Sequence, residues 1–240
     1  MTELLYLTDS YVKEFKANVI ATKPDIHGLI LDRSAFYPGG GGQPADSGKI
    51  KTENQSYPIS RVKRIDGEYV HIIEGENDLP SVGEVVLGSI DWDRRYHLMR
   101  THTAMHILCG VVFRDYGAQV TGGNMEPLKG RMDFEFETMR HELVADIETA
   151  INQEVNASRP TKIRILPREE AFQIPDLIRT KINLLPEHIN EVRVVEIEGL
   201  DIQADGGTHV KNTSEVGKLK IVDYKSKGKI NKRIYLEISE

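Results

Sequence analysis

The sequence has little of what several classes of protein require. Cys109 is its only cysteine, so it cannot form an internal disulfide, and we expect a reducing compartment such as the cytoplasm. Its apolar runs are only a few residues long, whereas a helix that spans a bilayer needs about 20. We therefore expect no membrane partner. No basic stretch precedes an apolar segment near Glu3, so we expect no secretory signal.

The chain is also poor in net positive charge. Its formal charge of −6 argues against indiscriminate binding to nucleic acid, although a net charge says nothing about local patches. One C-terminal stretch is an exception, because it holds seven cations against the single carboxylate of Asp223. These cations are Lys218, Lys220, Lys225, Lys227, Lys229, Lys232 and Arg233. A solvated hairpin is the simpler interpretation, and a surface that binds phosphates is the alternative.

Residues 1–90 have the pattern of a small β domain. Short apolar segments are separated by Gly, Asp, Asn and Pro turn signals, and no helical period interrupts them. Regular short strands of this kind favour a barrel or a sandwich. We expect strands at Asn18–Thr22, His27–Leu31, Tyr57–Val62, Tyr69–Ile73 and Glu84–Ser89.

Residues 91–240 have a mixed pattern and predict an α+β domain. A first helix begins at a cap provided by Asp91 or Asp93, and Gly117 ends it. A second amphipathic helix begins near Thr138 and ends before Pro160. We expect strands at Arg131–Glu137, Ile163–Leu166, Val192–Glu198, Val216–Asp223 and Ile230–Ile238. The domain boundary is therefore predicted between residues 90 and 91.

Two histidines stand four residues apart in the first predicted helix, at His102 and His106. Residues at this spacing lie on one helix face, so both imidazoles can reach one ion. Such a pair also occurs by chance, so a metal site is one of two interpretations. A zinc protease would need a glutamate directly after the first histidine, where this chain has Thr103. A protease is therefore disfavoured.

A second motif, Asp205-Gly206-Gly207-Thr208-His209, follows a predicted strand. Its paired glycines allow a tight turn, so Asp205 and His209 can face in one direction. A β-turn with a surface histidine is the alternative. Together with His102 and His106, the motif supplies three imidazoles and one carboxylate, which form a plausible zinc shell. We predict one zinc ion per chain.

A third motif is the glycine-rich run Phe36–Gly48. Four consecutive glycines cost about 0.5–1 kcal/mol each in chain entropy relative to alanine. The flanking Pro38 and Pro44 fix backbone angles and favour a shaped loop over a flexible one. The run lacks the lysine and hydroxyl of a phosphate-binding loop. The residues expected to contact a substrate or a neighbouring loop are Gly40, Gly41, Gly42 and Gln43.

Together these motifs resemble the editing domain of alanyl-tRNA synthetase and its stand-alone relatives, the AlaX family of trans-editing proteins. Arg94–Gly110 (RRYHLMRTHTAMHILCG) looks like the first metal motif of the family, and Asp201–Val210 (DIQADGGTHV) looks like the second. Phe36–Gly48 looks like the glycine-rich motif of the medium and long forms, which carry an extra β domain. The sequence shows no class II catalytic domain, which points to the medium form.

The resemblance implies a small β-barrel followed by the α+β editing domain that threonyl- and alanyl-tRNA synthetases share. It also implies that His102, His106 and His209 hold zinc in a hydrolase that removes serine, or glycine, from mischarged tRNA(Ala). The family usually has a cysteine four residues before the last histidine, where this chain has Asp205. A carboxylate can bind zinc at about 2.0–2.2 Å, so we expect Asp205 to be the fourth ligand or to hold a water. Zinc retention should then be weaker.

The segment Gly117–Gly122 (GAQVTG) aligns with the family segment in which a threonine contacts the serine hydroxyl. The resemblance therefore places Thr121 in an amino-acid pocket, and a strand threonine without a ligand is the alternative. A glutamine of the synthetase form has no counterpart here, because this chain has Gly122. Two other functions stay open: an editor of another mischarged tRNA, and a non-catalytic module that binds tRNA or metal. Monomer and homodimer are both compatible with the sequence.

Overall fold

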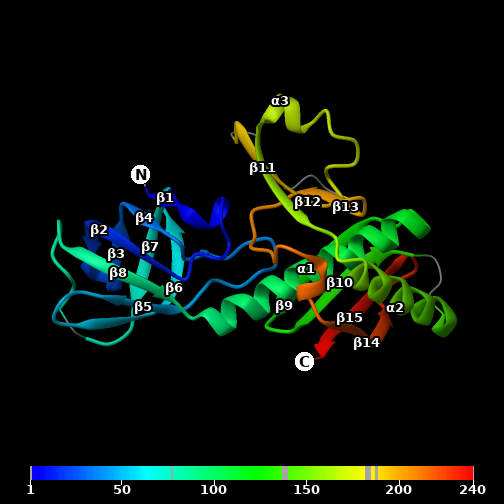
Figure 1. The fold of residues 1–240 in the computed structure, drawn as a ribbon, viewed down its shortest axis with the longest axis horizontal. Coiled ribbons are helices and arrows are strands. Elements are labelled where there is room, and N and C mark those ends of the chain that lie inside the picture. The colour runs from blue at the N-terminus through cyan, green and yellow to red at the C-terminus, as the bar shows by residue number, and fades with distance from the viewer. Residues whose placement is uncertain (1, 77, 137–139, 182–184, 187–188, 240) are drawn as a thin grey trace. The chain divides into compact units, whose positions relative to one another are not determined.

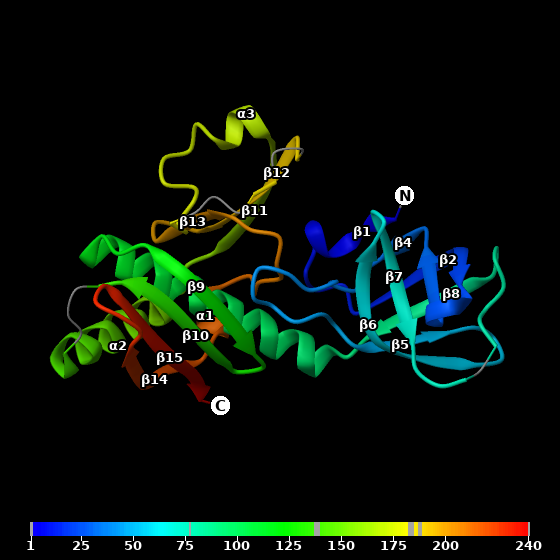
Figure 2. The ribbon, with the colours of Figure 1, turned by 180° about the vertical axis from the view of Figure 1, so that it is seen from behind.

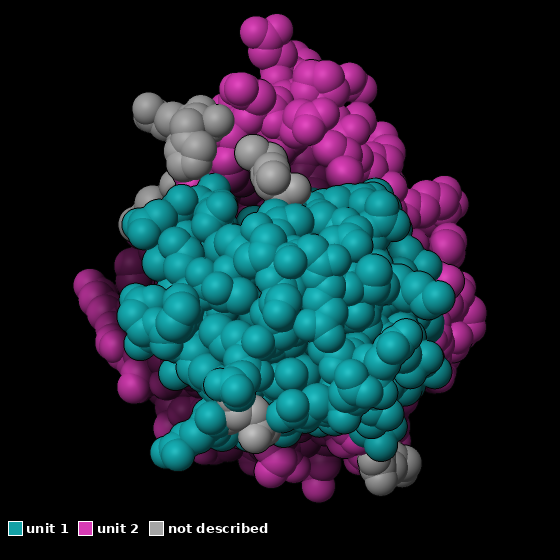
Figure 3. All heavy atoms as spheres, turned by 90° about the vertical axis from the view of Figure 1, so that its left-hand side faces the viewer, with its two compact units in different colours: residues 1–96 teal, residues 97–240 magenta. Residues whose placement is uncertain are grey.

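The computed structural model describes residues 2–76, 78–136, 140–181, 185–186 and 189–239. The chain divides into two compact units, residues 1–96 and residues 97–240 (Figure 3). This division falls inside helix α1 (Trp92–Tyr116), so the domain boundary between residues 90 and 91 stays a prediction. No described helix is both long and apolar enough to cross a membrane.

The first unit contains a closed barrel (Figure 1), which is one of the two architectures that the sequence favoured, a barrel or a sandwich. The strand order around the barrel is β2-β3-β7-β6-β5-β8. The five predicted segments coincide with β2, β3, β6, β7 and β8, except that His27 and Glu84 lie one residue before β3 and β8, and the short elements β1, β4 and β5 were not predicted. The bounds are β1 Glu3–Leu4, β2 Glu14–Lys23, β3 Gly28–Leu31, β4 Arg33–Ser34, β5 Gly48–Lys51, β6 Ser56–Ile65, β7 Glu68–Ile73 and β8 Val85–Ile90, with 3₁₀ turns at Leu5–Leu7 and Pro24–Ile26.

A buried ion pair closes the glycine-rich loop at its base. Arg95, in the first turns of α1, is fully buried and pairs with the carboxylate of Asp46. The same guanidinium donates to the carbonyl oxygens of Ser10 at 3.0 Å and Ala35 at 2.7 Å. Asp46 in turn accepts a hydrogen bond from the N–H of Tyr37 at 2.7 Å, and its own N–H donates to the Tyr37 carbonyl at 3.0 Å. The two ends of the loop are thereby fixed together.

The described residues of the second unit form two sheets and two long helices, which confirms the predicted α+β class. One sheet has the order β14-β15-β10-β9, and α1 and α2 lie on the same side of it (Figures 1 and 2). The other sheet has the order β11-β12-β13. The bounds are β9 Val120–Glu126, β10 Lys129–Glu135, α2 His141–Asn156, β11 Thr161–Pro167, α3 Arg168–Ala171, β12 Glu191–Ile197, β13 Asp201–Ala204, β14 Lys218–Ser226 and β15 Asn231–Ser239, with a 3₁₀ turn at Thr213–Glu215. Thr138, the predicted start of α2, lies outside the described residues.

Helix α1 is the central element of the second unit. The sequence predicted one buried face, but the residues from Leu98 to Val112 are all buried except Arg100, which is half-buried. Gly110 explains part of this burial, because a Cβ there would lie 2.9 Å from the side chain of Leu200. The absence of that Cβ lets the start of β13 approach the helix directly.

Removal of the Arg95 guanidinium should destabilise the protein strongly. Arg95→Met leaves the Asp46 carboxylate buried without its cation, which costs about 3–5 kcal/mol of unfolding free energy. Denaturant unfolding measures this value. Arg33→Met is the control, because the Arg33–Glu3 pair at 3.3 Å is exposed and should contribute at most about 1 kcal/mol. Equal effects of the two substitutions would contradict the role given to Arg95.

Candidate metal centre

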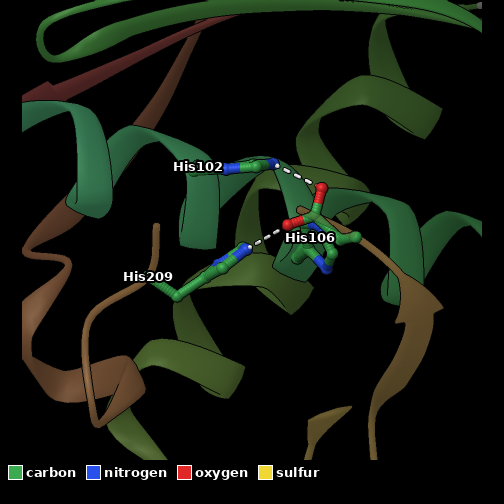
Figure 4. Close-up of side chains that lie close together, drawn as sticks. His102, His106 and His209 are labelled. Carbon is green, nitrogen blue, oxygen red and sulfur yellow. Dashed lines mark hydrogen bonds and ion pairs between the residues drawn. The ribbon is translucent and has the colours of Figure 1, made fainter. Parts of the chain in front are cut away.

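Three imidazoles from segments far apart in the sequence face one another (Figure 4). His102 and His106 lie one turn apart on α1, with ring centroids 5.1 Å apart. His209 lies in the loop after β13 and stacks on His102, with centroids 4.2 Å apart and ring planes at 30°. Its centroid is 4.6 Å from that of His106. The structure therefore brings the three predicted histidines together.

Asp205 adds a carboxylate to this cluster. Its Oδ2 lies 3.0 Å from Nε2 of His209, and its Oδ1 lies 3.5 Å from Nε2 of His102. One potential ligand atom from each of the four residues lies within 4.8 Å of all the others. Two atoms that each lie about 2.1 Å from one ion are at most about 4.2 Å apart, so small side-chain movements would allow a shared ion. The donor set fits a divalent metal, and the assignment of these residues as ligands stays a prediction.

Thr103 attaches the His209 loop to the helix. This threonine is fully buried, and its Oγ1 accepts a hydrogen bond from the N–H of Val210 at 3.2 Å. The same oxygen lies 3.2 Å from Nδ1 of His209. The sequence pattern identified Thr103 only by the missing glutamate. Its contact with residues more than a hundred positions away has no local sequence signal.

A second carboxylate, Asp201, contacts the ring of His106 and fixes its orientation. Its Oδ2 lies 3.0 Å from Nδ1 of His106 and accepts a hydrogen bond from the Gln203 amide at 2.7 Å. Its Oδ1 accepts a hydrogen bond from Nε of Arg179 at 3.3 Å. Metal-binding histidines commonly donate their other ring nitrogen to such a carboxylate. Sequence analysis assigned no role to Asp201, although a second acidic residue in the DIQAD motif was a usable signal.

The electrostatics favour the protonation state that metal binding needs at three of the four residues of the cluster. Burial lowers the pKa of His102 to about 4, and burial together with the neighbouring His102 holds the pKa of His209 well below its usual value. Burial opposes ionisation of Asp205, but the surrounding imidazoles, His102 foremost, hold the pKa of its carboxyl well below the usual range. Burial also disfavours protonation of His106, yet its hydrogen bond to Asp201 raises the pKa overall. Two neutral imidazoles and an ionised carboxylate are therefore available as donors.

Thr121, the predicted contact for a substrate hydroxyl, is exposed on the edge strand β9. Its hydroxyl donates a hydrogen bond to the side-chain oxygen of Asn231 at 3.0 Å. A role for Thr121 in binding an amino acid stays a prediction.

The glycine-rich loop is a tight turn in the first unit. The N–H of Gly40 donates to the Gln43 carbonyl at 3.0 Å, and the N–H of Gln43 donates to the Gly40 carbonyl at 2.8 Å. The four consecutive glycines 39–42 all have positive φ, between 54° and 143°, which other residues rarely adopt. Gly40 and Gly41 are exposed, Gly42 is half-buried and Gln43 is 2% exposed. The expected contact of these four residues with substrate stays a prediction.

Two family profiles match parts of the chain. The profile described as "Threonyl and Alanyl tRNA synthetase second additional domain" matches residues 192–235, which include Asp205 and His209. The profile described as "tRNA synthetases class II (A)" matches residues 5–94.

Relatives match over greater lengths. The alanyl-tRNA editing protein AlaX-M of Saccharolobus solfataricus is 42% identical over 240 residues, which cover 99% of each chain. The alanyl-tRNA editing protein AlaX-M of Methanosarcina barkeri is 40% identical over 242 residues, with the same coverage. The alanine–tRNA ligase of Ignicoccus hospitalis is 39% identical over 227 residues, which are 92% of this chain but 24% of the ligase.

Substitution of single histidines should remove the metal. His102→Ala and His209→Ala each delete one of three imidazole donors, so the bound divalent metal should fall from about one per chain to a small fraction after dialysis. Elemental analysis measures this stoichiometry. His141→Ala is the control, because His141 is exposed at the start of α2 and lies outside the cluster. Retention of a full equivalent of metal by His209→Ala would refute the ligand assignment.

Proposed function

Because the chain belongs to the AlaX-M family of alanyl-tRNA editing proteins, we propose that it hydrolyses mischarged tRNA(Ala) at a zinc site. Its main substrate is Ser-tRNA(Ala), and Gly-tRNA(Ala) is a second one. The observation that carries the proposal is the convergence of His102, His106, Asp205 and His209 in one cluster. The full-length similarity to AlaX-M proteins supports the choice of tRNA.

The reaction is hydrolysis of the ester that joins an amino acid to the terminal ribose of tRNA. Esters need little activation, so correct positioning and a polarised water are sufficient. When bound, zinc supplies Lewis-acid chemistry that polarises a carbonyl or acidifies a water. His106 enters this site in an orientation fixed by Asp201, while burial favours neutral His102 and His209, the form in which an imidazole can coordinate a metal. Each residue is thus prepared before substrate arrives.

In this proposal Asp205 would act either as the fourth ligand of zinc or as the residue that holds a water in the site. A zinc protease places its general base directly after the first histidine. Here that position holds Thr103, which binds the backbone of the loop that carries His209. The carboxylate instead comes from the loop that carries His209. As an oxygen donor it would hold zinc less firmly than the thiolate usual in the family.

Water, rather than a protein side chain, is the nucleophile in this proposal. Cys109 is the only thiol of the chain and is almost completely buried on α1. Burial raises its pKa well above the usual value, so the reactive thiolate is not populated near neutral pH. This observation supports direct hydrolysis over a covalent acyl-enzyme.

Selectivity against the cognate alanine follows from hydrogen bonding. A pocket built to bind a hydroxyl leaves polar groups unpaired when the hydroxyl is absent, and such groups cost binding energy. Thr121 is the proposed contact, with its hydroxyl released from Asn231 to the serine side chain.

A deacylation assay with Ser-, Gly- and Ala-charged tRNA(Ala) tests the function. We expect multiple turnovers with the serine ester, sparing of the alanine ester, and loss of at least about 90% of the rate after chelation, restored by added zinc. A full rate in protein shown to be metal-free would remove zinc from the proposal. An absence of turnover with every ester would favour a non-catalytic module, and hydrolysis only of another mischarged tRNA would favour an editor of that tRNA.

Thr121→Val keeps the shape of the side chain and removes its hydroxyl. We expect kcat/KM for Ser-tRNA(Ala) to fall about 10-fold, equivalent to one hydrogen bond of about 1.4 kcal/mol, with unchanged metal content. Asn231→Ala is the matched control, because it removes the present partner of Thr121 and leaves the hydroxyl in place. Parental kinetics in Thr121→Val would show that another residue reads the serine.

A further inference from the structure

The outer face of the barrel carries cations that have no use in the fold. Strands β2, β5, β6 and β8 together contain one carboxylate, Glu14, in a chain whose net charge is −6. Against it stand seven cations in the same four strands: Lys16, Lys23, Lys49, Lys51, Arg61, Lys63 and Arg64. Positive charge, which is the rarer sign in this chain, is therefore concentrated on these four strands.

The strand alternation points five of these side chains outward. Lys49 and Lys51 are exposed on either side of Ile50, which is fully buried in the barrel core. Arg61 and Lys63 are likewise exposed on either side of the buried Val62. Lys16 is exposed between two buried residues of β2. We call these five residues the barrel cationic face.

The register joins these side chains into one surface. Lys51 lies beside Leu87 of β8, and Leu87 lies beside Lys16 of β2. On its other side, β5 pairs with the beginning of β6, so that Lys49 lies beside Pro58. Arg61 and Lys63 lie farther along β6, past the residue that pairs with Gly48 at the start of β5. Alternate residues of a strand lie about 6.8 Å apart, so Lys49 and Lys51 form one closely spaced pair, and Arg61 and Lys63 form another.

These five cations are also not used in ion pairs within the described part of the chain. Among the residues that the structure describes, none of the five takes part in an ion pair, and Glu14 already accepts a hydrogen bond from Ser89 at 3.1 Å. An exposed cation with no internal partner is free to exchange its counterions for the phosphates of a polyanion, which gives a favourable release of ions.

The C-terminal basic run is different, because its structure uses several of its charges. Lys225 pairs with Asp223 at 2.8 Å, and Lys232 is buried and donates to the carbonyl oxygens of Gly228 and Lys229. The Arg233 guanidinium makes two hydrogen bonds to the carboxylate of Asp133, at 2.6 and 2.8 Å. Three of the seven cations in this run are therefore not available to a ligand.

We propose that the barrel cationic face binds the phosphate backbone of the tRNA substrate. The proposal rests on the proposed function, which requires a negatively charged protein to recognise a large polyanion. A local positive surface provides the attraction that the net charge opposes. Phosphate contacts of this kind position a nucleic acid without reading its bases, so the face supplies affinity, whereas the metal cluster supplies the chemistry.

Charge neutralisation with a matched control tests the proposal. The test variant carries Lys49→Gln, Lys51→Gln, Arg61→Gln and Lys63→Gln. The control variant carries four glutamines at exposed cations that already have carboxylate partners, so its net charge changes equally: Arg33→Gln, Lys129→Gln, Lys162→Gln and Arg164→Gln. Fluorescence anisotropy with tRNA(Ala) that carries no amino acid, over a salt series, gives the Kd of each variant. We expect the test variant to bind about 10-fold more weakly or worse, and the control to stay within about 2-fold of the parent.

The salt dependence gives a second measure. The slope of log Kd against log salt should fall by about one for each lost phosphate contact in the test variant and stay parental in the control. A third variant, with Lys49→Arg, Lys51→Arg and Lys63→Arg, keeps the charge and should bind like the parent. Equal binding by the test and control variants would overturn the proposal. So would a test variant that loses binding only to phosphatidylserine vesicles.

A small substrate separates this proposal from the proposed function. The seryl ester of adenosine has the reacting bond but no tRNA body, so the test variant should hydrolyse it at the parental rate. A parent protein that binds tRNA through this face but hydrolyses neither Ser-tRNA(Ala) nor the seryl ester of adenosine would refute the proposed function alone. A parent that hydrolyses both esters, with unchanged tRNA binding in the test variant, would refute the barrel cationic face alone.

Discussion

The contact of Thr103 with the loop that follows β13 is the interaction on which the candidate metal centre depends. Helix geometry alone places His102 and His106 side by side, but a third imidazole must come from a distant segment. Thr103 holds that segment by accepting the N–H of Val210 and by contacting the ring of His209. A histidine that binds a metal through Nε2 carries its proton on Nδ1, and the Thr103 oxygen is positioned to accept it. One hydroxyl thus fixes both the loop and the ring.

The close approach of β13 to α1 provides the other half of this arrangement. Gly110 leaves space for Leu200, and Asp201 then reaches Nδ1 of His106. Because both approaches bury the cluster, the imidazoles are held where a positive charge is disfavoured, which lowers the pKa of His102 and His209. Packing and protonation are therefore two consequences of one feature, the exclusion of water around α1.

The parts of the site that sequence could predict are those set by local spacing. The interval from His102 to His106 and the paired glycines before His209 are short patterns with direct geometric meaning. The roles of Thr103, Gly110 and Asp201 arise from contacts between distant segments and leave no periodic signal. Strands β5, β9 and β13 were not predicted either.

The aspartate at position 205 shapes the loop of the cluster and also supplies one of its donor atoms. Its Oδ2 accepts the N–H of Gly207 at 2.7 Å, which closes the turn that carries His209. The thiolate usual in the family is a poorer acceptor for such a bond. The carboxylate therefore stabilises the loop before any ion arrives, and part of the ordering that metal binding would otherwise require is already complete. In the proposed zinc site, an oxygen donor would attract the ion less strongly than a thiolate, whereas the preformed loop would favour binding, and both effects follow from the same side chain.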